Sequence, residues 1–277
     1  MLKAYDDIFG NEDTNSNEIT EIPISKLKAS VLNRFRNYDK EKEAEVTESI
    51  RRNGVLNPIQ VRKLDNETFE IIAGHNRTNC AEAAGLKTVP AFIKEMTDDE
   101  AVIIMVDTNL QREKIFPSDR ALAYRDKYVA LKNITKKGEL TDEYLQSAFG
   151  VSGRQVRRYL KISELHSAVL GLIDNNLITM EVALEMSDVS KSIQHIIYEL
   201  ISEKKIKIKK SHIKKIKDRN SINISKDEIL DVINEVKTNK KMKLDIDERY
   251  EKYFSNLTKE QVEEKIFEAL DMMSKRS

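Results

Sequence analysis

The chain has 277 residues, of which 40% are apolar and 34% are charged, and it contains a single cysteine, Cys80. This composition excludes a disulfide framework and a largely disordered chain, and the length is enough for two or three small domains. Four scattered histidines and one cysteine give no zinc spacing. No stretch approaches the roughly 18 apolar residues of a membrane span. We therefore expect a cytoplasmic protein that does not enter a membrane.

The net charge is zero, but the charges are unevenly distributed. Residues 1–50 carry 7 basic and 11 acidic side chains, residues 203–219 carry 9 and 2, and residues 245–277 carry 6 and 9. An acidic arm, a basic middle and an acidic end indicate different partners for different parts of the chain.

The first elements in chain order predict an α+β domain. After a flexible acidic arm, "ITEIPISKL" has strand character, and "KEKEAEVTESIRRNG" predicts a helix that ends at Gly54. "LNPIQVRKL" and "TFEIIAG" alternate like a strand pair. "LKTVPAFIKEM" predicts another strand, with Pro90 at a sheet edge or a strand start. From Asp98 onward the pattern is helical, so we expect an α+β front and an all-α back.

A polar turn, residues 74–77, follows the second strand of that pair. Gly74 lets the backbone approach a ligand, and Arg77 supplies a forked cation at the start of an alanine-rich helix. The first N–H groups of a helix and its dipole favour an anion. The alternative is that Arg77 pairs with a neighbouring carboxylate and Gly74 only makes the turn. We expect Cys80 to pack against the sheet.

A second polar cluster, residues 107–113, lies between two apolar helical segments. Pro117 and Ser118 are sound helix starts, so part of the pattern is capping. The cluster nevertheless contains more hydrogen-bonding side chains than a cap requires.

The segment "TDEYLQSAFGVSGRQVRRYLKISEL", residues 141–165, predicts a helix-turn-helix. Thr141 and Ser152 are caps and Gly150 makes the turn, and the buried faces carry one set of apolar residues each. These sets are Tyr144, Leu145 and Ala148, then Val156, Tyr159 and Leu160. The second helix leaves a basic face free, so we expect it to bind double-stranded DNA. The candidate DNA-binding residues are Ser152, Gly153, Arg154, Gln155, Arg157, Arg158 and Lys161. The alternative is a helical hairpin with a solvated basic face.

Five segments in this order resemble the ParB family of partition proteins, especially the branch carried on mobile elements. They are "RFRNYD", "SIRRNGVLNPIQVR", "EIIAGHNRTNCAEAAGLKTVPAFI", "VDTNLQREKIFPSDRALAY" and the helix-turn-helix. The resemblance covers roughly residues 20–185. It implies a ParB/sulfiredoxin-like front domain that binds CTP. The residues it implies for the nucleotide are Arg36, Gly54, Gly74, His75, Asn76, Arg77, Thr108, Asn109, Gln111 and Arg112.

The chain departs from the family at several positions. The usual Gly-Glu-Arg-Arg is residues 74–77 here, and the usual Glu-Asn is Thr108-Asn109. A carboxylate expected to hold Mg²⁺ is therefore missing, and the metal candidates are Asn109 and Asp107. We expect CTP binding with slow hydrolysis. The usual arginine after the capping serine is Gly153, and the usual Gly-His-Ala-Arg segment is "EVAL", so the DNA site need not be the common centromere-like sequence.

The predicted organisation has four parts. Residues 1–19 form the arm, 20–116 the nucleotide-binding domain, 117–220 the helix-turn-helix domain and 221–277 a helical segment. In the last part, Thr258 and Gln261 form a capping box before an apolar stripe, which favours dimerisation or packing on the helical domain. The stripe consists of Val262, Ile266, Phe267, Leu270 and Met273. The resemblance implies a homodimer, a ParA-type ATPase as partner and a nucleoid- or plasmid-associated location.

Two further patterns leave their alternatives open. The lysine-rich segment, residues 203–219, is either a second nucleic-acid surface or a solvated helix whose isoleucines pack inward, and the two are compatible. The whole chain has two alternatives to partition. A ParB-like nuclease would share the front fold, and a transcription regulator would need only the helix-turn-helix.

Overall fold

The computed structural model describes residues 18–65, 67–112, 114–136, 138, 140–219, 224–238, 254 and 257–274. The predicted arm therefore lies almost wholly outside the described residues. Contacts divide the chain into two compact units, residues 1–233 and 234–277. The boundaries predicted at 19/20, 116/117 and 220/221 stay predictions. Among the helices that the structure describes, none is long and apolar enough to cross a membrane.

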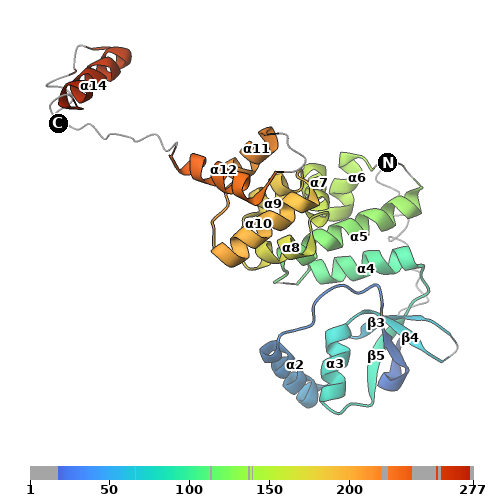
Figure 1. Ribbon diagram of the computed structural model, residues 1–277. Coiled ribbons are helices and arrows are strands. Elements are labelled where there is room, and N and C mark those ends of the chain that lie inside the picture. The colour runs from blue at the N-terminus through green and yellow to red at the C-terminus, as the bar shows by residue number, and fades with distance from the viewer. Residues whose placement is uncertain are drawn as a thin grey trace. The chain divides into compact units, whose positions relative to one another are not determined.

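The front of the first unit is a five-stranded mixed sheet (Figure 1). Its strands are β1 (Ile19–Pro23), β2 (Leu27–Ala29), β3 (Ile59–Lys63), β4 (Phe69–Ala73) and β5 (Thr88–Ile93), and a 3-10 turn, η1 (Ile24–Lys26), joins the first two. The spatial order is β1-β5-β3-β4-β2. The pairs β1/β5 and β3/β4 are antiparallel, and the pairs β3/β5 and β2/β4 are parallel. The predicted strand pair is confirmed as β3 and β4.

The alternation of strand side chains divides the sheet into two faces. Ile59, Val61 and Val89 pack with α2 (Lys40–Asn53) and α3 (His75–Ala83) on one face. Ile72 packs on the other face against α4 (Asp98–Leu110). Helix α2 ends where expected, because Gly54 caps it with a positive φ of 71°. Cys80 is buried in the first of these cores, as predicted.

The prediction that Pro90 marks a sheet edge or a strand start is wrong. Pro90 is the third residue of β5, and β5 lies between β1 and β3. The parallel pairing with β3 begins at Ala91, one residue later, so Pro90 lies outside that ladder. An interior strand therefore accommodates the missing N–H donor.

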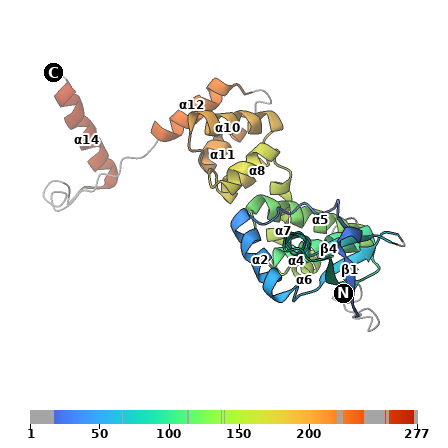
Figure 2. The same cartoon turned by 90° about the horizontal axis from the view of Figure 1, so that it is seen from below.

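The rest of the described chain is helical, as predicted. The helices are α5 (Pro117–Thr135), α6 (Asp142–Phe149), α7 (Gly153–Ser163), α8 (Ser167–Asp174), α9 (Met180–Met186), α10 (Lys191–Lys204), α11 (Lys210–Asp218), α12 (Lys226–Thr238) and α14 (Lys259–Ser274). Helix α4 packs on both β4 and α5, so it joins the sheet to the helical region (Figures 1 and 2). One apolar core joins α4 to α7, and a second one joins α5 and α7 to α12.

Helix α14 is the described part of the second unit. The predicted capping box is confirmed, because Gln261 N donates to Thr258 Oγ1 at 3.4 Å and Thr258 N donates to Gln261 Oε1 at 2.9 Å. Of the predicted stripe, Val262 is buried, whereas Phe267 and Met273 are 66% and 69% exposed. The side chain of Leu270 lies outside the described residues.

Candidate nucleotide and DNA sites

Gly74 fixes the geometry of the polar turn. Its φ of 107° and ψ of 19° place it in the left-handed region, directly before α3. A Cβ at this position would lie 2.6 Å from Ile59 Cγ2 and 3.3 Å from Arg77 Nη2. No side chain caps the helix that begins here. The turn therefore needs glycine for two reasons, and it leaves the start of α3 open to an anion.

The other three residues of the turn are held by backbone groups of distant segments. Ser30 N donates to His75 Nε2 at 3.2 Å, and Tyr38 N donates to the buried Asn76 Oδ1 at 3.3 Å. The Arg77 guanidinium donates to the carbonyl of Pro58 at 3.0 Å and also to the carbonyl of Asn57. Among the described residues Arg77 therefore pairs with no carboxylate, in contrast to the alternative considered above.

Three basic side chains, His75, Arg77 and Arg112, lie at or near this turn, and the charges of Glu70 and Asp119 act on His75 and Arg112 respectively. Burial lowers the pKa of Arg77 and of Arg112. Burial, followed by the charge of Arg112, lowers the pKa of His75 to about 4. Within the described residues no ion pair is formed by Arg77 or Arg112. The Arg112 guanidinium instead lies 5.8 Å from the ring centre of Tyr38. Arg77 and Arg112, two partly buried cations without an ion pair in the described part of the chain, fit a phosphate chain.

The residues just before Arg112 are engaged within the protein. Thr108 Oγ1 donates to the carbonyl of Ile104 at 2.8 Å. Asn109 Nδ2 donates to the carbonyl of Met105 at 2.7 Å, and its Oδ1 is buried without a hydrogen-bond partner. Gln111 is exposed at the end of α4.

Asp107 does not have the surroundings of a metal ligand. It pairs with the ammonium of Lys127, a fully buried side chain on α5 that also donates to the carbonyl of Ala148 at 2.6 Å. In the described part of the chain no group of three or more His, Cys, Asp or Glu side chains could hold a metal ion. The donors present do not fit Mg²⁺ well, and the roles of Asn109 and Asp107 stay predictions.

Residues 30–39, which we call the connecting segment, run from β2 to α2 and contact both halves of the first unit. The segment holds the polar turn through Ser30 and Tyr38, as described above. It reaches the helical region through Arg36, whose Nη2 donates to Asp174 Oδ2 at 2.6 Å and to Ser118 Oγ at 3.1 Å. Arg36 also stacks 4.2 Å from the ring centre of Phe116. The Arg36 guanidinium thus contacts the helical region, whereas its backbone carbonyl accepts from Arg112 Nη1 at 3.2 Å, and its role in nucleotide binding stays a prediction.

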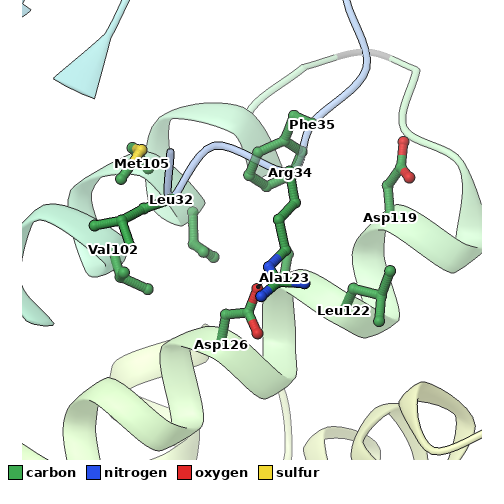
Figure 3. A pocket seen from close by; sticks show the side chains of 10 residues that line it. Leu32, Arg34, Phe35, Val102, Met105, Asp119, Leu122, Ala123 and Asp126 are labelled. Carbon is green, nitrogen blue, oxygen red and sulfur yellow. Dashed lines mark ion pairs between the residues drawn. The ribbon is translucent and has the colours of Figure 1, made fainter. Parts of the chain in front are cut away.

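Arg34 makes a second contact between the connecting segment and α5. Its Nε lies 3.2 Å from Asp126 Oδ2, and Figure 3 shows the two side chains pointing toward one another. Beside them is a cavity of about 20 Å³, lined by Leu32 and Phe35 and by residues of α4 and α5. A cavity of this size holds one water molecule or so, far less than a nucleotide. This region is therefore a packing contact between the connecting segment and helices α4 and α5, and not a nucleotide site.

Helices α6 and α7 form the predicted helix-turn-helix. Thr141 accepts from Tyr144 N at 3.3 Å, Ser152 accepts from Gln155 N at 3.3 Å, and Gly150 ends α6 with a φ of 67°. The predicted inward residues are confirmed: Leu145, Ala148 and Val156 are buried, and Tyr144, Tyr159 and Leu160 pack beside them. The opposite side of α7 carries the basic residues.

Gly153 is explained by a close approach of α6. A Cβ on Gly153 would lie 2.9 Å from Asp142 Cα and 2.4 Å from Asp142 Oδ1. Neither a backbone atom nor a helix start can move away at little cost, so a larger residue would shift α6 against α7. The arginine usual in the resembled family does not fit here without such a shift.

The candidate DNA-binding cations fall into two groups. Arg154 and Arg158 form no ion pair within the described residues, and Arg154 is exposed. Arg157 pairs with Asp142, and Lys161 Nζ lies 3.0 Å from Asp188 Oδ1. Arg154, at the beginning of α7, where the prediction places the base contacts, is thus one of the two cations of this helix without an ion pair in the described part of the chain.

The sequence did not identify three parts of these sites. Tyr38 lies within a quoted motif but was not selected, although it contacts both the polar turn and Arg112. The two carbonyls that hold Arg77 carry no sequence signal. Lys127 is the third, and a lone lysine in a helical pattern gives no sign that it is buried.

Part of the chain is similar to known proteins. The model of the ParB N-terminal domain family matches residues 10–110. The probable chromosome-partitioning protein ParB of Pseudomonas putida is 32% identical over 152 residues, which cover 55% of this chain and 50% of that protein. The chain thus spans about half the length of the curated relatives it matches.

Two crystal structures of the C-terminally truncated chromosome-partitioning protein ParB from Caulobacter crescentus are also similar. The complex with the centromeric parS site is 22% identical with a TM-score of 0.46, and the match covers 78% of this chain and 99% of that one. The complex with CTP-γ-S is 26% identical with a TM-score of 0.33, and that match covers 65% and 99%.

Proposed function

We propose that this chain, whose residues 10–110 match the ParB N-terminal domain family, is a CTP-gated, sequence-specific DNA-binding protein of a partition system. The front domain binds CTP, α7 reads double-stranded DNA, and a homodimer closes on the DNA as a clamp. A ParA-type ATPase is the proposed partner. Membership of a mobile-element branch stays a prediction.

The observation that carries this proposal is the position of the connecting segment. Ser30 and Tyr38, near its two ends, are hydrogen-bonded to His75 and Asn76, and Arg36 between them is hydrogen-bonded to Ser118 and Asp174 on α5 and α8. A phosphate chain that displaced the contacts at the polar turn would therefore act on the helices that carry the helix-turn-helix. Such a shared element is what gating of one site by the other requires.

The residues of the polar turn fit a nucleotide phosphate. Gly74 leaves room for close approach, α3 begins without a side-chain cap, and Arg77 and Arg112 supply charge. A bound nucleotide would supply the anion that these groups lack. Hydrolysis is proposed to be slow, because Asp107 is already paired with Lys127 and Thr108 bonds to its own helix.

The experiment that tests the function is nucleotide binding by the full chain with and without duplex DNA. We expect labelled CTP to bind, and Arg77→Ala to weaken that binding by about 10- to 150-fold while leaving DNA binding in place. The expected loss is about 1.5 to 3 kcal/mol for a charge-assisted contact. Unchanged CTP affinity in Arg77→Ala would remove the assignment of the polar turn.

The same assay separates the two alternatives. DNA cleavage that depends on a divalent metal would support a nuclease. DNA binding without any effect of CTP would support a transcription regulator. Crosslinking of the front domains that requires both CTP and DNA would support the clamp.

A further inference from the structure

A second row of basic side chains lies on α11 and the residues just before it. Ile213 and Ile216 of this helix are buried in the core, which directs the intervening residues outward. Lys207, Lys209 and Lys214 are exposed, and none of them forms an ion pair in the described part of the chain. The isoleucines thus pack inward, as one alternative for this segment predicted, and the lysines form an outer face.

The outer face of α11 adjoins the recognition helix α7 through one carboxylate. Asp188 Oδ1 accepts from Lys161 Nζ at 3.0 Å, and Asp188 Oδ2 accepts from Lys217 Nζ at 2.9 Å. Lys161 belongs to α7 and Lys217 to α11, so the two ammonium groups lie on either side of the same acid. Helix α9, which packs against both helices, brings them together (Figure 1).

The acids at this junction do not balance the bases. Asp188 and Glu185 are shared among Lys161, Lys210 and Lys217, with Glu185 3.4 Å from Lys210 Nζ and 3.5 Å from Lys217 Nζ. The pKa of Lys217 is raised by its hydrogen bond to Asp188, so this ammonium stays charged. The three lysines of the outer face come in addition, and the surface that runs from α7 to α11 is basic.

We infer that this surface, from Lys161 to Lys207, Lys209 and Lys214, binds the phosphate backbone of DNA beside the site that α7 reads. This inference rests on the proposed DNA binding and adds a second, sequence-independent contact to it. Lysine is a mobile point charge that releases counterions from DNA without distinguishing bases. The base contacts of α7 then specify the site, and the α11 surface adds affinity for every sequence.

The test compares two triple variants of the full chain that lose the same charge. The first is Lys207→Gln, Lys209→Gln and Lys214→Gln. The control is Lys26→Gln, Lys63→Gln and Lys87→Gln, which changes three exposed lysines of the sheet domain. Binding to a fluorescent duplex of mixed sequence is measured by anisotropy over a series of sodium chloride concentrations.

The expected result is a change of salt dependence in the first variant alone. Each phosphate contact contributes about 0.9 to the slope of log affinity against log salt, so the loss of three lowers the slope by about 2 to 3. Discrimination between sequences should stay as in the original chain, whereas Arg154→Ala should reduce it. The control should keep the original slope.

Two results would overturn the inference. Equal slopes for the first variant and the original chain would show that the α11 surface does not contact DNA. The proposed function would not be affected by that result. Tighter binding of single-stranded RNA than of duplex, lost in the same variant, would assign the surface to another partner. Failure of the original chain to bind duplex at any salt concentration would instead remove the proposed function and, with it, this inference.

Discussion

The polar turn before α3 and the turn before α7 both begin a helix at a glycine, but they differ in how their arginines are held. At the first turn Gly74 has a positive φ and no room for a Cβ, and Arg77 is held on two backbone carbonyls. At the second turn Gly153 is crowded without a positive φ, and Arg154 is exposed without an ion pair among the described residues. One site is built into the fold, and the other lies on its surface.

This difference has an energetic consequence. A buried cation such as Arg77 is positioned before its ligand arrives, so little side-chain entropy is lost on binding, but substitution there disturbs the protein itself. Exposed arginines lose more entropy on binding DNA, and they can be replaced without harm to the fold. Substitutions at the two turns should therefore separate stability from binding.

The largest expected effect is that of Gly74→Ala. The new methyl group would meet Ile59 and would also be held at a φ of 107°, so we expect a loss of about 2 to 4 kcal/mol in the free energy of unfolding. Gly150→Ala is the matched control, because its φ of 67° and ψ of 10° are left-handed like those of Gly74 but no atom lies within 4 Å of the added Cβ. That control should lose about 1 kcal/mol from backbone strain alone.

Urea unfolding of both variants would measure the difference. Equal losses in Gly74→Ala and Gly150→Ala would show that contact with Ile59 is not what demands glycine at the polar turn. The comparison of the two turns would then lose its structural basis.

The next effect should appear in binding and leave stability unchanged. Arg154→Ala and Gln155→Ala remove side chains at the start of α7, where the proposed function places the contacts to base edges. We expect discrimination between a specific duplex, obtained by selection, and a mixed one to fall by about 1 to 3 kcal/mol. The unfolding midpoint should stay within the error of the original chain, since Arg154 is exposed.

Competition binding with the two duplexes would measure this loss. Arg157→Ala is a useful companion, because Arg157 is already engaged with Asp142 beside Gly153. Intact discrimination in a folded Arg154→Ala and Gln155→Ala variant would move base recognition away from α7.

Local sequence signals predicted most of the fold and part of the sites. Caps and turn glycines fixed the helix ends at Gly54, Thr141, Gly150 and Ser152, because these signals act within a few residues. Strand order has no such local signal, and the edge position expected for Pro90 was wrong for that reason. The signal for the polar turn is likewise local, and its residues were predicted correctly.

The contacts between distant segments could not be predicted. Asp174 lies 138 residues after Arg36, and nothing near either residue indicates their hydrogen bond. Lys127 and Asp107 are a similar case, because nothing near either residue indicates that the buried Lys127 ammonium pairs with the Asp107 carboxylate. Hydrogen bonds and ion pairs between distant residues depend on how whole helices and strands pack. That packing cannot be worked out residue by residue from a single sequence.

The smallest expected effect concerns His75 and the pH dependence of stability. The folded protein lowers the pKa of His75 from 6.5 to about 4, mainly through burial, and Nε2 must stay unprotonated to accept from Ser30 N. Between these two pH values the unfolded chain binds a proton that the folded chain does not. Stability should therefore be lost as the pH falls from 6.5 to 4, and be fully present above 6.5.

The size of this effect follows from the exposure of the ring. His75 is only partly buried, so the expected loss is about 1 to 2 kcal/mol, less than the full shift would give. Urea unfolding at several pH values, compared between the original chain and His75→Gln, isolates the contribution of this one histidine. Glutamine keeps an acceptor for Ser30 N but does not titrate. The original chain should lose more stability than His75→Gln between pH 6.5 and 4. Parallel curves of stability against pH for the two proteins would mean that the folded polar turn tolerates a positive charge on His75. The difference drawn here between the built-in site at α3 and the surface site at α7 would then be weaker.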